Sequence, residues 1–245
     1  MNINKLQHSD EAVINLENVK RHFKVGDNTV RALRGVNLKI YSKDFVVIFG
    51  PSGCGKSTLL NLILGIDKPT SGNVHVRDKD IFKMSDDERA MFRLSKIGMV
   101  HQMPYWVKSL TVRENIAIPL IIKGIKEETA MQRADRIMEE LNIGELGHQR
   151  PTQLSGGQQQ LTGLARALVT NPWIIIADEP TGNLDSINAE EMMQMLHDLN
   201  TKHKRTVLVV THNGKYWDFG NRRVEMIDGK IIKDAKHKDG SKISS

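Results

Sequence analysis

The sequence predicts an α/β fold with a mostly parallel sheet, and two patterns point to it. Short apolar runs rich in β-branched residues recur along the chain, as is typical of strands buried in a parallel sheet. These runs are residues 45–49, 97–100, 173–177 and 207–210. Segments with helical periodicity lie between the runs, and strands that alternate with helices indicate a parallel α/β architecture.

The predicted helices are marked by caps and by apolar faces. The segment from Ser85 to Glu88 matches the capping box that begins a helix. Apolar residues recur on one helical face within residues 126–141 and again within residues 188–200. We therefore expect helices between the strands and a more helical middle third, at about residues 107–168.

The first 44 residues differ from the rest and predict a small antiparallel sheet. Short alternating segments occur at residues 13–19 and 30–40, with turn residues at 26–28 and 42–43. No internal repeat stands out, and no long linker rich in Pro, Gly or Ser interrupts the chain. One compact unit is therefore expected.

Composition limits the classes of protein that fit. With 245 residues and 39% hydrophobic content, the chain can bury a large core without disulfides. Its single cysteine, Cys54, excludes a disulfide framework and a cysteine-based zinc site. The first 11 residues lack the apolar region of a signal peptide, and the apolar run at 116–122 is far shorter than the roughly 20 residues of a membrane span. We expect a soluble protein, or one held at a membrane by a partner.

The formal net charge of +6 is unevenly distributed. Residues 229–245 contain five lysines and two aspartates and so carry half of it. This tail is either simply solvated or attracted to anionic lipid or a phosphate backbone. The small remainder is weak evidence for nucleic acid, and no nucleic-acid partner is expected.

A glycine-rich loop follows the apolar run at 45–49 and begins a predicted helix at residues 57–64. It matches the pattern G-x-x-x-x-G-K-[ST], in which backbone N–H groups converge on phosphate oxygens. The lysine reaches the β- and γ-phosphates, and the hydroxyl after it ligates Mg²⁺. The candidate nucleotide-binding residues of this loop are Gly50, Ser52, Gly53, Cys54, Gly55, Lys56, Ser57 and Thr58.

A second motif narrows the chemistry to nucleotide hydrolysis. The apolar run at 173–177 ends in Asp178 and Glu179. An aspartate at such a strand end holds the Mg²⁺ shell, and a carboxylate one residue later can act as general base toward a water molecule. The guanine-selecting pattern Asn-Lys-x-Asp is absent from the sequence, which disfavours a GTPase.

The segment Leu154-Ser-Gly-Gly-Gln158 identifies a family. With it, the chain from about Val13 to Ile232 resembles the ATP-binding-cassette ATPases. The resemblance implies a P-loop NTPase fold with a RecA-like parallel core, an N-terminal antiparallel β subdomain and a helical signature subdomain. It implies an N-terminal tail at 1–11, a nucleotide-binding domain at 12–233 with the helical subdomain at about 103–168, and a flexible basic tail at 234–245.

The resemblance also assigns roles to single residues. It places Gln102 on Mg²⁺ and the attacking water, His212 on the γ-phosphate, and Asp185 at a subunit interface. Phe23 occupies the position of an aromatic ring that stacks on adenine, although a packing role for Phe23 stays open. The signature residues complete the ATP pocket of a second copy, so that a homodimer encloses two nucleotides; these residues are Ser155, Gly156, Gly157 and Gln158.

Residues 80–86, 109–115 and 177–186 resemble one branch, the lipoprotein-releasing and macrolide-exporter cassettes. The implied protein hydrolyses ATP with Mg²⁺ and drives an integral membrane permease subunit from the cytoplasmic face of the inner or plasma membrane. An alternative is an envelope-remodelling ATP switch of the cell-division type, without transported cargo. A clamp acting on DNA or ribosomes is disfavoured, because the chain has neither a long coiled-coil insertion nor a second cassette.

Three departures from the family pattern concern the site. Leu161 stands where the branch has an arginine, which bears on hydrolysis rate or dimer geometry. Tyr105 and Trp106 add aromatic character after Gln102, and they are either anchors for a membrane partner or ordinary buried rings. Cys54 is expected to be inert, although its modification should block ATP binding.

Overall fold

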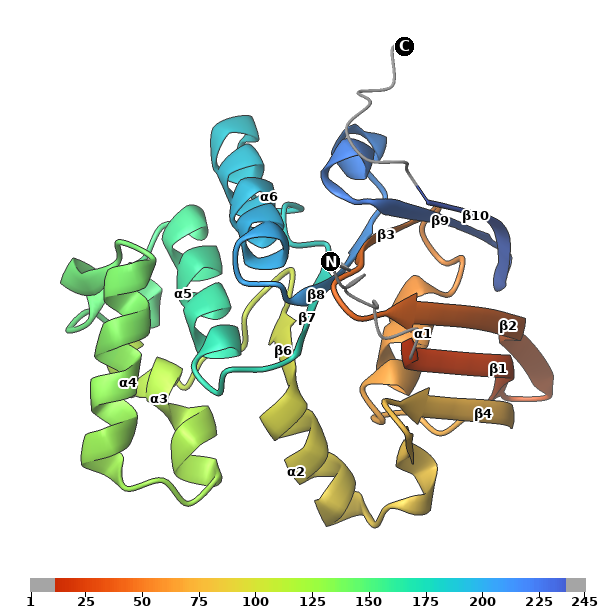
Figure 1. Ribbon diagram of the computed structural model, residues 1–245, viewed down its shortest axis with the longest axis horizontal. Coiled ribbons are helices and arrows are strands. Elements are labelled where there is room, and N and C mark those ends of the chain that lie inside the picture. The colour runs from red at the N-terminus through yellow and green to blue at the C-terminus, as the bar shows by residue number, and fades with distance from the viewer. Residues whose placement is uncertain (1–11, 237–245) are drawn as a thin grey trace, which may run out of the picture.

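The computed structural model describes residues 12–236 and contains two sheets. In Figure 1 the antiparallel sheet and a bundle of helices lie on opposite sides of a central sheet. The antiparallel sheet has the order β2(Asn28–Tyr41), β1(Ala12–Val25), β4(Ser71–Val76), β5(Lys79–Asp80). The central sheet has the order β10(Lys230–Lys236), β9(Arg222–Ile227), β3(Phe45–Phe49), β8(Thr206–Thr211), β7(Ile174–Asp178), β6(Ile97–Val100).

The helices follow the predicted pattern. The longer ones are α1(Lys56–Ile63), α2(Asp86–Lys96), α3(Val112–Ile122), α4(Glu127–Glu140), α5(Gly156–Leu168) and α6(Ser186–Thr201). Short 3₁₀ turns occur at Ile81–Lys83, Gly144–Leu146, Pro151–Gln153 and Gly214–Phe219. Ser85 caps α2 in the capping box that the sequence predicted, with the Glu88 carboxylate accepting from the Ser85 N–H. Within the described residues, no helix combines the length and apolarity needed to cross a membrane.

Alternation along the central strands divides the core into two layers. Val46 and Ile48 of β3 point into the layer shared with α1 and the antiparallel sheet. Phe45 and Val47, which alternate with these residues along the strand, point into the layer covered by α5 and α6. A third cluster is formed by α3, α4 and α5 on the helical side. The sheet is therefore buried on both faces, which explains its continuous apolar runs.

Parallel pairing aligns the ends of the three strands that precede the functional loops. Phe49 of β3 pairs with Thr211 of β8, and Val210 of β8 pairs with Asp178 of β7. The chain segments after these strands consequently emerge at one edge of the sheet. This edge holds the glycine-rich loop, the Asp178–Glu179 pair and His212.

The two ends of the chain differ in part from the sequence-based expectation. β1 and β2 are single strands of 14 residues rather than several short ones, since bulges interrupt the alternation without ending the pairing. Residues 234–236, expected in the flexible basic tail, belong to β10, where Asp234 pairs with Val224. The rest of that tail and the N-terminal segment 1–11 lie outside the described residues.

Arg222, at the start of β9, joins the two sheets. Its Nε and Nη2 donate to the two carboxylate oxygens of Asp234 at 2.7 and 2.6 Å. Its Nη1 donates to the carbonyl of Lys39 on β2 and lies 3.4 Å from the buried carboxylate of Asp44. Because β2 belongs to the antiparallel sheet, this buried guanidinium holds that sheet against the central one.

We expect Arg222→Ala to lower the free energy of unfolding by about 3 kcal/mol, because Asp44 and Asp234 lose their buried partner. Urea unfolding followed by circular dichroism measures this loss. The matched control is Arg136→Ala on the exposed face of α4, which should change stability by less than about 0.5 kcal/mol. Equal midpoints for the two variants would contradict the bridging role.

Candidate functional site

A cleft of about 700 Å³ opens at the sheet edge where β3, β7 and β8 end. It brings together residues that are far apart in the sequence. Ten of the predicted site residues line it: Ser52, Gly53, Gly55, Lys56, Ser57, Thr58, Gln102, Asp178, Glu179 and His212. Phe23, Gly50, Cys54, the four signature residues and Asp185 do not.

Close packing determines the shape of the glycine-rich loop. A Cβ at Gly50 would lie 2.3 Å from the carbonyl oxygen of Met226, and one at Gly55 would lie 2.5 Å from that of Ala32. Gly55 also has φ of +104°, which side-chain-bearing residues rarely adopt. The Nζ of Lys56 donates to the carbonyls of Gly50 and Pro51 at 2.6 and 2.9 Å. The ammonium is thus held at the cleft by the loop itself.

The loop leads directly into α1, whose N-terminus faces the cleft. Gly55 is the N-cap, and it has no side chain to accept hydrogen bonds from the first turn. The unpaired N–H groups and the positive end of the helix dipole therefore remain available for an anion. Together with Lys56 they make this end of the cleft suited to the phosphates of a nucleotide.

Glu179 and His212 meet in the same cleft. His212 Nδ1 lies 2.9 Å from Glu179 Oε1, within hydrogen-bond distance. Glu179 has φ of +47°, a left-handed conformation that costs a non-glycine residue about 1 kcal/mol or more. Its N–H donates to the carbonyl of Val210 on β8 at 2.9 Å, which holds the turn in place. The carboxylate is therefore aimed and held before any substrate binds.

Asp178, at the end of β7, has a raised pKa. Burial is the main cause, and the charge of Glu179 adds to it, whereas Lys56 and a hydrogen bond from Ser57 act in the opposite direction. Asp178, the Ser57 hydroxyl and the Gln102 amide offer the hard oxygen ligands that Mg²⁺ prefers. Within residues 12–236, His, Cys, Asp and Glu side chains form no group of three suited to a metal. This donor set fits an ion that takes its other ligands from phosphates and water.

The outer wall of the cleft consists of residues that no motif indicated. They come from the β1–β2 hairpin and the β9–β10 turn and are Thr29, Val30, Arg31, Ala32, Arg34, Asp228 and Gly229. Gly229 connects this wall to the loop, because its N–H donates to the carbonyl of Cys54 and its carbonyl accepts from the N–H of Arg34, both at 2.9 Å. The hairpin and the glycine-rich loop are therefore joined through one turn.

Phe23 lies beside this wall rather than in it. It pairs with Val30 across the β1–β2 hairpin, and Val30 is the member of the pair that lines the cleft. The guanidinium carbon of Arg21 lies 4.4 Å from the centroid of the Phe23 ring. Stacking of Phe23 on a base stays a prediction, and it would use the ring face away from Arg21 or require Arg21 to move.

The signature residues form a separate, exposed surface at the N-terminus of α5. Ser155 caps the helix in a capping box, with its Oγ accepting from the N–H of Gln158. A Cβ at Gly157 would lie 2.9 Å from Oδ1 of Asn188 on α6, so the two helix N-termini are in contact. Asp185 caps α6, and its hydrogen bonds with Asn188 hold the pKa of its carboxyl below the usual range. This surface contributes no residue to the cleft.

Comparison with known proteins decides the family. The profile of the family described as ABC transporter matches residues 33–182. An ABC transporter ATP-binding protein of Methanocaldococcus jannaschii, MJ0796, is 43% identical over 228 residues, which cover 91% of this chain and 97% of that protein. The chain belongs to the ABC transporter family. It is an ATP-hydrolysing cassette of that family, as the sequence predicted.

Solved structures support the same assignment. The dimeric structure of MJ0796 in a post-hydrolysis state, bound to ADP and Pi, superposes with a TM-score of 0.86 at 40% identity and covers 93% of this chain and 100% of that one. This likeness confirms the predicted cassette fold. The macrolide export ATP-binding/permease protein MacB of Acinetobacter baylyi is 39% identical over 93% of this chain, which spans only 34% of MacB.

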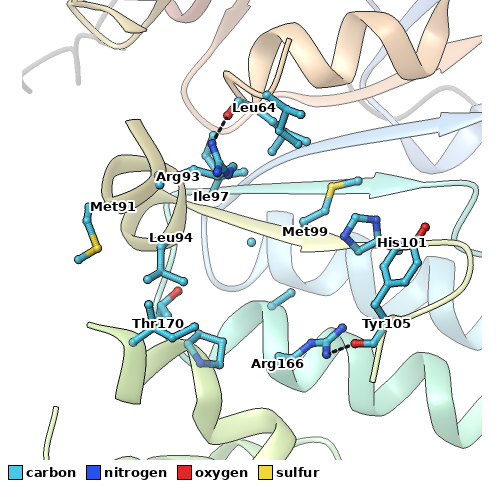
Figure 2. A pocket seen from close by; sticks show the side chains of 16 residues that line it. Leu64, Met91, Arg93, Leu94, Ile97, Met99, His101, Tyr105, Arg166 and Thr170 are labelled. Carbon is cyan, nitrogen blue, oxygen red and sulfur yellow. Dashed lines mark hydrogen bonds between the residues drawn. The ribbon is translucent and has the colours of Figure 1, made fainter. Parts of the chain in front are cut away.

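A second cavity, of about 500 Å³, lies on the cassette between the core and the helical side. We call it the α2–α3 groove; its walls come from α2, β6, α3 and α5, as Figure 2 shows. Apolar side chains are exposed around it, including Tyr105 at 80% and Ile122 at 60%. Two arginines and a histidine line it, and no Asp or Glu is among its described lining residues.

The basic groups of the groove are partly desolvated. Burial lowers the pKa of Arg166 on α5 to about 10, and it lowers the pKa of His101, with a smaller contribution from the charge of Arg166. Arg166 donates to the carbonyl of Tyr105 at 2.6 Å (Figure 2). Its guanidinium carbon also lies over the ring of Trp106, 4.3 Å from the ring centroid. Trp106 is thus a packed ring, whereas Tyr105 is exposed. The sequence left open whether these rings are anchors for a partner or ordinary buried rings. Trp106 fits the second alternative, and the exposed Tyr105 does not.

Cys54 is 4% exposed and belongs to the core beneath the loop. We expect an aromatic disulfide reagent to leave the folded cassette unmodified and to react with one thiol per chain after unfolding in guanidinium chloride, because only the exposed thiolate attacks. Absorbance of the released thiolate measures both states. Rapid reaction of the folded protein would contradict the buried position.

Proposed function

We propose that this cassette is the nucleotide-binding subunit that drives a membrane permease of the lipoprotein-releasing or macrolide-exporter type. The observation that carries the proposal is the division of the ATP-handling residues between two surfaces. The glycine-rich loop, the carboxylates, Gln102 and His212 share one cleft, while the signature residues, of which Ser155 and Gly156 are exposed, lie outside it. A second copy is needed to bring a signature surface to each cleft, and MJ0796 supplies a dimeric relative.

Within the cleft, each side chain has a chemical task. The N-terminus of α1 and Lys56 bind the phosphates. Ser57, Asp178 and Gln102 would hold Mg²⁺, which when bound neutralises charge on the phosphate oxygens. Glu179 accepts a proton from a water molecule while the water oxygen attacks the γ-phosphorus. The bond between the γ-phosphorus and the β–γ bridging oxygen breaks, which releases ADP. His212 orients Glu179 through their 2.9 Å contact and contacts the γ-phosphate.

We expect Glu179→Gln to bind ATP yet hydrolyse it about 100-fold or more slowly, because the amide orients water without accepting its proton. Lys56→Ala should instead weaken ATP binding itself. Phosphate release and fluorescent-nucleotide titration separate the two effects. In Glu179→Gln, ATP should also convert monomers to dimers in sedimentation velocity.

The control is Glu139→Gln, an equal change on the exposed face of α4 that should leave turnover as in the wild type. If Glu179→Gln hydrolysed ATP at the wild-type rate, Glu179 would not be the base. If the wild-type chain neither bound ATP nor ever paired, the proposed function would fail.

For the membrane partner, we infer that the permease docks in the α2–α3 groove. The groove is bordered by exposed apolar side chains, and its described lining includes the guanidinium groups of Arg93 and Arg166 but no Asp or Glu. A segment that is apolar and carries an Asp or Glu would cover this surface and pair its positive charge. Tyr105 and His101 also follow β6 on either side of Gln102, so a partner seated here touches the segment that reaches the nucleotide cleft.

Because Cys54 is buried, Tyr105→Cys carries one accessible thiol for a photo-cross-linker. In inverted native membrane vesicles, we expect it to capture a polytopic membrane protein. Glu139→Cys is the matched control, since α4 contributes no residue to the groove. Adding Arg166→Glu to Tyr105→Cys should reduce capture, because a partner carboxylate would then face a carboxylate. Equal capture at positions 105 and 139 would contradict docking in the groove.

A further inference from the structure

Gln160 is a buried polar side chain to which no motif assigns a role. It lies on α5, five residues after the cap Ser155, and is 2% exposed. Its Nε2 lies 3.1 Å from the carbonyl oxygen of His101, 2.9 Å from that of Gln102 and 3.1 Å from that of Pro180. All three acceptors belong to segments outside the helix that carries Gln160.

The orientation of the amide follows from its neighbours. Three carbonyl oxygens only accept hydrogen bonds, so the nitrogen must face them and its two N–H groups are shared among three acceptors. The Oε1 atom on the other side is buried and has no partner within the described residues. The hydrogen bonds from the amide nitrogen therefore determine the position of this side chain, and the amide oxygen is left without a partner.

The three carbonyls flank the groups that act on the nucleotide. Gln102 lines the cleft, and the carbonyl of Pro180 comes directly after Glu179, which has the left-handed φ of +47°. The two loops also touch one another, since Asn183 Nδ2 donates to the carbonyl of Gln102 at 3.3 Å. Gln160 thus lies where the loop of Gln102 meets the turn of Glu179.

The other end of the same helical segment is the exposed signature surface. Five residues of α-helix span about 7.5 Å, a distance over which a helix behaves as a rigid body. Gln159 accepts from the indole N–H of Trp106 at 3.2 Å, and Arg166 donates to the carbonyl of Tyr105. With Gln160, three residues of α5 therefore bond to the segment after β6. A shift of the α5 N-terminus must therefore displace the carbonyls that Gln160 holds.

We propose that Gln160 is a positioning residue that couples the signature surface to the hydrolytic groups of its own chain. When a second copy presents its nucleotide to Ser155, α5 is fixed in place, and Gln160 thereby sets the positions of Gln102 and Glu179 in the cleft of its own chain. This coupling rests on the proposed ATP-dependent dimer. The positioning of Gln102 and Glu179 does not, because it is present in the single chain.

The main test is Gln160→Glu, which keeps the shape of the side chain and replaces the donor nitrogen with an oxygen that repels the three carbonyls. We expect kcat for ATP to fall about tenfold or more with KM changed by less than about twofold, since Lys56 and the N-terminus of α1, which bind the phosphates, do not contact Gln160. Gln132→Glu, the same change at an exposed position of α4, is the control and should match the wild type.

A pH profile separates positioning from a general structural defect. A buried carboxyl among carbonyl oxygens favours its protonated form, which supplies one O–H donor. The ratio of variant to wild-type kcat should therefore rise as pH falls from about 8 to about 6. The titratable groups on the neighbouring segments are His101, Asp178, Glu179 and His212, and taking the ratio divides out the pH dependence that both proteins share. A Gln160→Glu variant with wild-type kcat, or one whose kcat and KM worsen together, would overturn the proposal.

A second variant keeps the test decisive if Gln160→Glu does not fold. Gln160→Met removes the donor without adding charge and should show the same loss of kcat at unchanged KM. In a double-mutant cycle with Ser155→Ala, the combined loss should be at least about fivefold smaller than the product of the separate losses. Independent effects would overturn the coupling to Ser155, and a folded Gln160→Met with wild-type kcat would overturn the positioning role.

The outcomes also distinguish this inference from the proposed function. Wild-type hydrolysis and the ATP-dependent dimer of Glu179→Gln are measured first. Their failure would remove the proposed function, whereas their success together with silent Gln160 variants would remove only the role of Gln160.

Discussion

The parallel pairing of β3, β8 and β7 is the constraint on which the site depends. Because Phe49 pairs with Thr211 and Asp178 with Val210, the three loops that follow these strands emerge together. Hydrogen bonds that belong to the sheet thereby set the distances between the phosphate-binding loop, the carboxylates and His212. The alternating apolar residues of these strands fill the layers on both faces, so the geometry of the site is secured by the whole core.

Sequence reasoning located the parts of the molecule that follow local rules. The limits of β3 and β6, and the capped start of α2 at Ser85, agree with the structure because apolar runs and caps are local signals. The long pairing of β1 with β2 was underestimated, because bulges shift the alternation within a strand that continues. The strand residues 234–236 were missed because Asp234 pairs with Arg222 and Lys236 pairs with Asp44, contacts that the local sequence does not show.

For the site, motifs identified the residues that touch phosphate chemistry and missed those that shape the cleft. Arg31 and Arg34 line it only because the β1–β2 hairpin folds against the glycine-rich loop. Gln160 was likewise invisible, because its significance lies in three carbonyls from segments about 20 and 60 residues away. These contacts arise from tertiary packing. The family motif ends at Gln158 and does not include Gln160.

Gly229 connects the glycine-rich loop to the β1–β2 hairpin through two backbone hydrogen bonds, and this connection affects the affinity for nucleotide. The glycine-rich loop is wedged between the carbonyls of Ala32 and Met226 and tied through Gly229 to the hairpin, so its curvature is acquired as the protein folds. The loop loses its backbone conformational entropy during folding, so binding a triphosphate does not have to order it. Affinity therefore depends on the β9–β10 turn, and a larger residue at position 229 would loosen phosphate binding by displacing the turn that holds the glycine-rich loop.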